Sequence, residues 1–151
     1  MKNDTRSEIL LNVIKERNAI TACIQETWRT GIELLERKSF IIVSNGLDQN
    51  VQRGNRGSQG VAIALNPDGE AAWKAAGYEK HMNFGARVLA IRLLLKDHEN
   101  RDIGVFLIST YAPIGNASDD EWDLYFNQLS SCIAKKSQND ILLIGSDTNS
   151  S

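Results

Sequence analysis

Blocks of apolar residues with two different spacings divide this chain into predicted helices and strands. Three segments carry apolar residues at the spacing of an amphipathic helix. These segments cover residues 6–18, 70–77 and 118–136. Shorter, continuous apolar runs are typical of buried strands. They cover residues 19–25, 39–44, 60–65, 86–95, 102–110 and 140–144.

Local chemistry supports the ends of the predicted helices. The buried face of the first helix is predicted to carry Ile9, Leu10, Val13 and Ile14. The stretch "SDDE" (118–121) has the Ser-x-x-Glu form of a capping box, which predicts where the third helix begins.

The order of these elements favours a mixed sheet with helices outside it. The strands at 86–95 and 102–110 are joined by the polar stretch "KDHENR", so they are predicted to pair as an antiparallel hairpin. Pro and Gly in "NPDG" (66–69) predict a tight turn. Hairpins combined with crossover helices indicate an α/β fold that is not purely parallel. The length of 151 residues fits one domain.

Composition and charge narrow the choice of partners. The net charge is -2, so the protein as a whole has no electrostatic attraction to nucleic acid or to an anionic membrane. Phosphate binding therefore requires a local patch or a metal. No apolar run approaches the roughly 20 residues that a membrane span needs. Cys23 and Cys132 lie in apolar stretches and are interpreted as buried thiols, which favours a reducing, intracellular setting.

Glu26 directly follows the predicted strand at 19–25. A carboxylate at a strand end is costly unless it is solvated, paired or bound to a metal. It is either a surface residue in a strand-to-loop turn or a ligand of a hard cation such as Mg²⁺, which takes few carboxylates and several waters.

Asp147 and Asn149 lie two residues apart after the last predicted strand. If this stretch is extended, their side chains point to the same side. The Asp could then orient or deprotonate a water, and the Asn could donate to a phosphoryl oxygen. The alternative is a turn in which both side chains satisfy their own backbone.

Tyr111 and two arginines are further candidates for phosphate contacts. Tyr111 ends the strand at 102–110, where its phenol could bind a phosphate oxygen; the alternative is a half-buried packing residue with its hydroxyl in water. Arg53 and Arg56 lie in the glycine-rich stretch "RGNRG". They suit either contact with a phosphate backbone or a solvated surface loop.

In combination and order, these stretches resemble the endonuclease/exonuclease/phosphatase superfamily. The similarity rests on "IQET" (24–27), "GVAIAL" (60–65), "ARVLAIRL" (86–93), "YAP" (111–113) and "ILLIGSDTN" (141–149). It covers essentially the whole chain and looks nearest to the apurinic-type endonuclease domains of non-LTR (LINE-like) retrotransposons. The resemblance implies a mixed-sheet α/β sandwich, in which two stacked β-sheets are flanked by helices.

By this resemblance the candidate residues take family roles. Glu26 matches the metal-binding Glu of a "QE" motif, and Tyr111 matches the phosphate-contacting Tyr of a "YAP" motif. Asp147 and Asn149 match the Asp and Asn of "GDFN". Mg²⁺ is the implied cofactor, with Mn²⁺ as an alternative, and DNA is the implied partner of the intact enzyme.

The chain also departs from the family pattern. "GDFN" becomes "GSDTN", because Ser146 intrudes and Thr148 replaces the aromatic residue. Family members begin with a strand that carries an Asn, for which Asn3 and Asn12 are not convincing substitutes. Their second half, with a further Asp and an Asp-His pair, is expected beyond residue 151. We therefore expect a partial domain, incomplete at both ends.

The predicted function is Mg²⁺-dependent phosphodiester hydrolysis of the DNA endonuclease type in a retroelement-derived protein. We expect little or no activity from residues 1–151 alone, and self-association through uncovered sheet edges. One alternative is a non-catalytic remnant or binding module that keeps only the fold, and another is a phospholipid or inositol phosphate phosphodiesterase. A retroelement origin would suggest the nucleus as the compartment.

Overall fold

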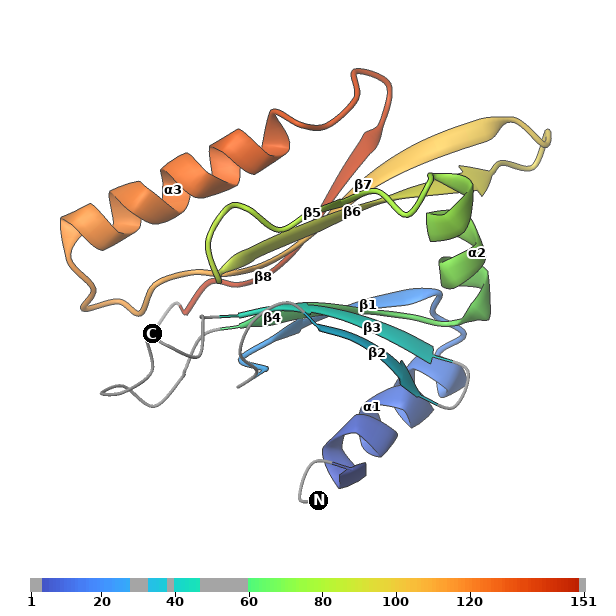
Figure 1. The fold of residues 1–151 in the computed structure, drawn as a ribbon, viewed down its shortest axis with the longest axis horizontal. Helices are drawn as coiled ribbons and strands as arrows, with labels where there is room; N and C mark the ends of the chain where they lie inside the picture. Colours follow the sequence, from blue (N-terminus) through green and yellow to red (C-terminus); the bar gives the residue numbers. More distant parts are fainter. Residues whose placement is uncertain (1–3, 28–32, 38–39, 47–59, 150–151) are drawn as a thin grey trace.

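A computed structural model of the protein places its strands in two sheets that lie face to face (Figure 1). It describes residues 4–27, 33–37, 40–46 and 60–149. The strand order is β1-β4-β3-β2 in the first sheet and β5-β6-β7-β8 in the second. Helices pack on both outer faces, so the predicted mixed-sheet α/β sandwich is confirmed.

The first sheet is antiparallel throughout. Its strands are β1 (Thr21–Gln25), β2 (Glu33–Arg37), β3 (Phe40–Asn45) and β4 (Val61–Leu65). All residues of β4 are buried and apolar, as expected for a central strand that is covered on both faces. Gln25 and Asn45 both pair with Val61. The ends of β1 and β3 therefore lie at the same edge as the start of β4.

The second sheet is mixed. Its strands are β5 (Lys80–His81), β6 (Val88–Lys96), β7 (Asp102–Tyr111) and β8 (Ile141–Asp147). Strands β6 and β7 pair antiparallel along their length, which confirms the predicted hairpin. Strand β8 is parallel to β7. Helix α3 (Asp119–Ile133) carries the chain from the end of β7 back to the end of the sheet where β7 begins, and β8 starts there.

The three helices of the described part of the chain have two different positions (Figure 1). They are α1 (Asp4–Glu16), α2 (Pro67–Ala75) and α3. Ile14 of α1 packs on Ile42 at the outer face of the first sheet, and Tyr125 of α3 packs on Phe106 at the outer face of the second. Helix α2 places Trp73 in the apolar core between the sheets and closes one end of the sandwich.

The buried face of α1 differs from the prediction. Leu11 and Ile14 are buried, whereas Ile9 and Val13 are 58% and 47% exposed. Leu10 is partly buried against the outer face of the first sheet. The apolar residues of this helix spread over more than one side, so spacing alone did not determine which side would meet the sheet.

The start of α3 agrees with the prediction from local sequence, whereas the start of α2 does not. Ser118 caps α3 by accepting a 3.3 Å hydrogen bond from the Glu121 N–H, which confirms the predicted start. The predicted turn at 66–69 is instead the first turn of α2. There the Gly69 N–H donates to Asn66 Oδ1 at 2.8 Å, and Pro67 occupies the first helical turn.

Two short edge strands, β2 and β5, are not predicted by the sequence. Charged residues at both ends of β2 and the length of only two residues for β5 hide the strand pattern. Because an edge strand pairs on one side only, it tolerates such residues.

The structure also bears on the predicted burial of the two thiols and on the presence of a membrane-spanning helix. Cys132 is buried, as predicted, and Cys23 is only partly buried. Across residues 4–27, 33–37, 40–46 and 60–149, no helix has both the length and the apolar character that crossing a membrane requires.

Candidate functional site

The C-terminal ends of β1, β7 and β8 meet at one edge of the sandwich. Tyr111, the last residue of β7, pairs in register with Asp147, the last residue of β8. Gln25, at the end of β1, donates from Nε2 to the Gly145 carbonyl at 3.3 Å and to Ser109 Oγ at 3.4 Å. These contacts join the two sheets at the edge where Glu26 follows β1 and where Tyr111 and Asp147 end β7 and β8.

Gly145 makes this close approach possible. Strand β8 continues straight through it to Asp147, so its role is not to turn the chain. A Cβ at Gly145 would lie 2.5 Å from Cys23 Cβ and 2.6 Å from Cys23 Sγ. Only a residue without a side chain lets β1 pack directly against β8 here.

Glu26 and Tyr111, which are 85 positions apart in sequence, are in direct contact. The Tyr111 hydroxyl donates to Glu26 Oε1 at 2.7 Å. Burial, first of all, and this hydrogen bond raise the pKa of Tyr111, while the neighbouring Asn149 amide opposes the shift. Tyr111 is therefore a neutral donor in the physiological range, and the alternative of a hydroxyl in water is not what the structure shows.

The backbone of Glu26 has an uncommon conformation. Its φ of 53° lies in the left-handed region, which non-glycine residues seldom adopt. The neighbouring Thr27 N–H donates to the Gly60 carbonyl at 3.2 Å and holds the chain in this turn. Strained residues of this kind concentrate at functional sites. The turn presents the exposed Glu26 side chain beside Tyr111.

Asp147 and Asn149 reach the same place by a different route from the predicted one. Asn149 is not extended, since its φ is 47°. Its N–H donates to Asp147 Oδ1 at 3.0 Å, and its Nδ2 donates to the Ala112 carbonyl at 2.7 Å. The Asp147 side chain thus bonds to its own backbone segment, as in the alternative interpretation, whereas the Asn149 side chain bonds to the segment that follows Tyr111. Glu26, Tyr111, Asp147 and Asn149 are called the strand-end cluster below.

Arg87 is a member of this region that sequence reasoning missed. Its guanidinium carbon lies 5.4 Å from the centre of the Tyr111 ring, within the range of a cation–π contact. Its Nη2 donates to Glu121 Oε1 at 2.7 Å. The sequence shows only an arginine near the start of the predicted strand 86–95, and nothing local indicates that the residue faces the end of another strand.

The donor set of the cluster fits a hard cation better than a soft one. The described residues contain no group of three or more His, Cys, Asp or Glu side chains placed to hold a metal. Mg²⁺, however, commonly uses one or two carboxylates and keeps several waters. Glu26 and Asp147 supply carboxylates at this edge, and the buried hydroxyl of Thr27 next to Glu26 has no hydrogen-bond partner. The oxygen-only donors therefore fit Mg²⁺ or Mn²⁺.

The two predicted phosphate-contacting arginines, Arg53 and Arg56, lie outside the described residues. The histidines of the described residues pair with neighbouring glutamates and not with residues of the strand-end cluster. His81 pairs with Glu79 at 2.8 Å, and His98 lies 3.6 Å from Glu99.

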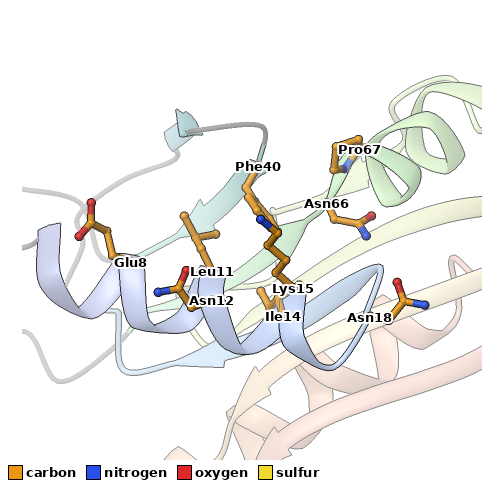
Figure 2. Close-up of a pocket in the computed structure, with 9 residues that line it drawn as sticks. All are labelled: Glu8, Leu11, Asn12, Ile14, Lys15, Asn18, Phe40, Asn66 and Pro67. Atoms are coloured by element: carbon orange, nitrogen blue, oxygen red, sulfur yellow. The ribbon is translucent and has the colours of Figure 1, made fainter.

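A separate groove of about 530 Å³ lies between α1 and the start of α2 (Figure 2). Leu11, Ile14 and Phe40 contribute apolar surface, and Lys15 lines the same groove. Asn66, which also lines it, follows the C-terminal end of β4, opposite to the end that pairs with Gln25. The groove is therefore at the other end of the first sheet from the strand-end cluster.

Comparison with known proteins adds no relative: no family model, no curated protein and no solved structure matches the chain.

Proposed function

We propose that the strand-end cluster is the site of a Mg²⁺-dependent phosphodiester hydrolase of the DNA endonuclease type, derived from a retroelement. The observation that carries the proposal is the 2.7 Å hydrogen bond between Tyr111 and Glu26, at the edge where Asp147 and Asn149 also lie. The resemblance to the endonuclease/exonuclease/phosphatase superfamily assigns roles to these same four residues. An intracellular, nuclear setting is part of the same proposal.

Each residue has a task that its surroundings support. Glu26 would hold Mg²⁺, or Mn²⁺ in its place, and the cation would supply positive charge beside the phosphate. Asp147 has one carboxylate oxygen engaged by the Asn149 N–H, and its other oxygen would orient the attacking water. Asn149 would donate to a phosphate oxygen, and Tyr111 would turn its one hydroxyl proton from Glu26 to a phosphate oxygen when Glu26 holds the cation.

Hydrolysis balances with these groups. The water oxygen forms a bond to phosphorus while the bond from phosphorus to the leaving sugar oxygen breaks. Asp147 accepts the water proton, and the leaving oxygen takes a proton from solvent. No histidine side chain contacts the strand-end cluster in the described residues, so protonation of the leaving oxygen has no dedicated donor there. We therefore expect little or no turnover from this chain.

Because turnover is expected to be low, the test measures Mn²⁺ binding by electron paramagnetic resonance. Glu26→Gln is expected to weaken Mn²⁺ binding by roughly tenfold or more, because it removes one carboxylate charge. Glu16→Gln, at the exposed C-terminal end of α1, is the matched control and is expected to leave affinity unchanged. Equal affinity of the Glu26→Gln variant and the unaltered protein would contradict the assignment.

A second arm identifies the phosphodiester. A fluorescent duplex with an abasic site or a nick is titrated in the presence of Mn²⁺, and vesicles containing a phosphoinositide are titrated in parallel. Binding of the duplex alone supports the DNA endonuclease type. Binding of the vesicles alone supports a phospholipid or inositol phosphate phosphodiesterase instead.

A non-catalytic binding module is a second candidate function, and one observation favours it. Asp147 Oδ1 and the Asn149 amide are already engaged within the protein, by the Asn149 N–H and the Ala112 carbonyl. A module of this kind would bind the duplex equally well with and without Mn²⁺, and with Glu26→Gln. For the hydrolase site, by contrast, duplex binding is expected to be stronger with Mn²⁺ than without it, and weaker for Glu26→Gln than for the unaltered protein.

We further propose that the protein self-associates through β8. This strand pairs with β7 on one side, and within the described residues no strand pairs with its other side. Ile141, Leu143 and Ile144 are 50%, 49% and 43% exposed, and residues 141–146 carry no charge. An uncharged apolar edge strand favours pairing with another chain.

Light scattering after size-exclusion chromatography tests the self-association. The unaltered protein is expected to elute as a dimer or larger species. Leu143→Lys places a charge on the edge and is expected to shift the protein to monomer. Leu124→Lys is the control, since Leu124 is similarly exposed, at 57%, but lies on α3. A monomeric unaltered protein would overturn the proposal.

A further inference from the structure

Arg87 lies where three parts of the protein meet. It precedes β6, its guanidinium lies over the Tyr111 ring at the end of β7, and it pairs with Glu121 in the first turn of α3. We propose that Arg87 is a positioning residue of the strand-end cluster, which holds Tyr111 and the Ala112 carbonyl in place against α3. This inference rests on the proposed function, because it gives Arg87 a task at that same site.

The contacts of Arg87 restrain Tyr111 from two directions. The Arg87 carbonyl accepts a hydrogen bond from the Tyr111 N–H at 3.0 Å, which holds the backbone. The guanidinium lies 5.4 Å from the ring centre, which restrains rotation of the phenol. The ring is thereby oriented so that its hydroxyl meets Glu26 at 2.7 Å.

The same side chain also reaches the other half of the cluster. Arg87 Nη1 donates to the Ala112 carbonyl at 3.4 Å, and this carbonyl is the acceptor for Asn149 Nδ2 at 2.7 Å. The Ala112 N–H donates to the Asp147 carbonyl at 2.9 Å. A shift of residue 112 would therefore move Asn149 and Asp147 together.

A planar guanidinium suits this place because it stacks on a ring and donates in two directions at once. The Arg87 side chain is 12% exposed, whereas its partner Glu121 is 41% exposed. The arginine is thus enclosed and its anchor is at the surface. A lysine keeps the positive charge but presents a compact ammonium on a flexible stem, so it cannot make the three contacts together.

The test uses Arg87→Lys, since a variant of equal charge separates geometry from electrostatics. The first readout is the proton resonance of the Tyr111 hydroxyl, which is assigned by its loss in Tyr111→Phe. A hydroxyl held against a carboxylate is protected from exchange with water, so it is expected to be visible in the unaltered protein. Arg87→Lys is expected to broaden or remove it, and Glu121→Gln is expected to do so to a smaller extent. Arg101→Lys, in the exposed β6–β7 turn, is the control and is expected to retain it.

The second readout is Mn²⁺ affinity. Arg87→Lys is expected to weaken it by roughly three- to tenfold, because the Glu26 carboxylate must then be ordered at the time of binding. In the Tyr111→Phe background the same substitution is expected to have a clearly smaller effect, since only the contact of Arg87 with the Ala112 carbonyl then still acts on the cluster. Additive effects in this double-mutant cycle would overturn the inference.

The two readouts distinguish the two proposals. If the unaltered protein does not bind Mn²⁺, the proposed function fails, and the hydroxyl resonance still decides the role of Arg87. If Glu26→Gln loses Mn²⁺ but Arg87→Lys keeps both the hydroxyl resonance and the affinity, only the positioning role fails.

Discussion

Strand β8 begins after one aspartate and ends on another, and the two carboxylates lie in opposite environments. Asp140 is buried and receives two hydrogen bonds from Arg92, at 2.7 and 2.8 Å. The pair lies over Gly104, where any side chain would collide with the carboxylate. Asp147 at the other end is exposed, and among the described residues its Oδ1 accepts one hydrogen bond, from the Asn149 N–H.

The comparison shows that burial and partners, not residue type, separate a structural carboxylate from a candidate for chemistry. The hydrogen bonds from Arg92 lower the pKa of Asp140 and use both of its oxygens. The second carboxylate oxygen of Asp147 has no hydrogen-bond partner among the described residues. Arginines follow the same division, because Arg92 is committed to Asp140 whereas Arg87 connects Glu121 to the strand-end cluster.

The largest expected effect comes from breaking the buried ion pair between Arg92 and Asp140 at the start of β8. Arg92→Met leaves the Asp140 carboxylate buried without its partner, and we expect the free energy of unfolding to fall by about 3 kcal/mol. Urea denaturation measures the change. Replacing both residues, as Arg92→Met with Asp140→Leu, is expected to recover much of the loss. A double variant no more stable than Arg92→Met would contradict the role of the ion pair.

Next in size is the contact that lets the two sheets meet near the candidate site. Gly145→Ala would force a Cβ to 2.5 Å from Cys23 Cβ, so we expect a loss of about 1–3 kcal/mol in the free energy of unfolding. Cys23→Gly in the same chain moves the missing Cβ to the other strand and is expected to restore part of the stability. The close contact would be excluded as the cause if the double variant showed no recovery.

The ion pair of Asp140 also predicts how the free energy of unfolding depends on pH in the acid range. The folded-state pKa of Asp140 lies below its unfolded value, so its contribution is present above about pH 4 and is lost as the pH falls through the folded pKa. Thermal unfolding between pH 5 and pH 2 is expected to vary less steeply for Asp140→Asn than for the unaltered protein. Equal slopes for the two proteins would show that this pair does not govern acid stability.

The smallest effect on stability is expected at Asp147, the exposed carboxylate at the end of β8. Asp147→Asn is expected to change the free energy of unfolding by less than about 0.5 kcal/mol, as for an ordinary surface substitution. The same change is expected to weaken Mn²⁺ binding by roughly tenfold, because it removes a carboxylate charge. A large loss of stability with unchanged Mn²⁺ affinity would reverse the comparison between the two ends of β8.

Local patterns predicted those features whose causes are local. The hairpin of β6 and β7 follows from two apolar runs around a polar stretch, and the Ser118 cap follows from one residue and the N–H three positions later. The side of α1 that is buried was only half predicted, since Ile9 and Val13 are exposed while Leu11 and Ile14 are buried. Several faces of this helix are apolar, and only the sheet beneath it selects one.

The candidate site was predicted as a set of residues and not as an arrangement. Glu26, Tyr111, Asp147 and Asn149 were singled out because each ends or follows a strand. Their resemblance to a family pattern suggested that they meet. The direct hydrogen bond between Glu26 and Tyr111, and the presence of Arg87 over the ring, could not be predicted because they depend on how one sheet stacks on the other.

By itself, the sequence determined the helices, most of the strands and the choice of candidate site residues, because spacing, caps and side-chain type act over a few residues. Only the tertiary structure decided that Asp140 is buried in an ion pair with Arg92 while Asp147 is exposed, and that a glycine in β8 faces a cysteine in β1. Both depend on the packing of strands that are distant in sequence, and a carboxylate acquires its role from the charges and the solvent that this packing leaves around it.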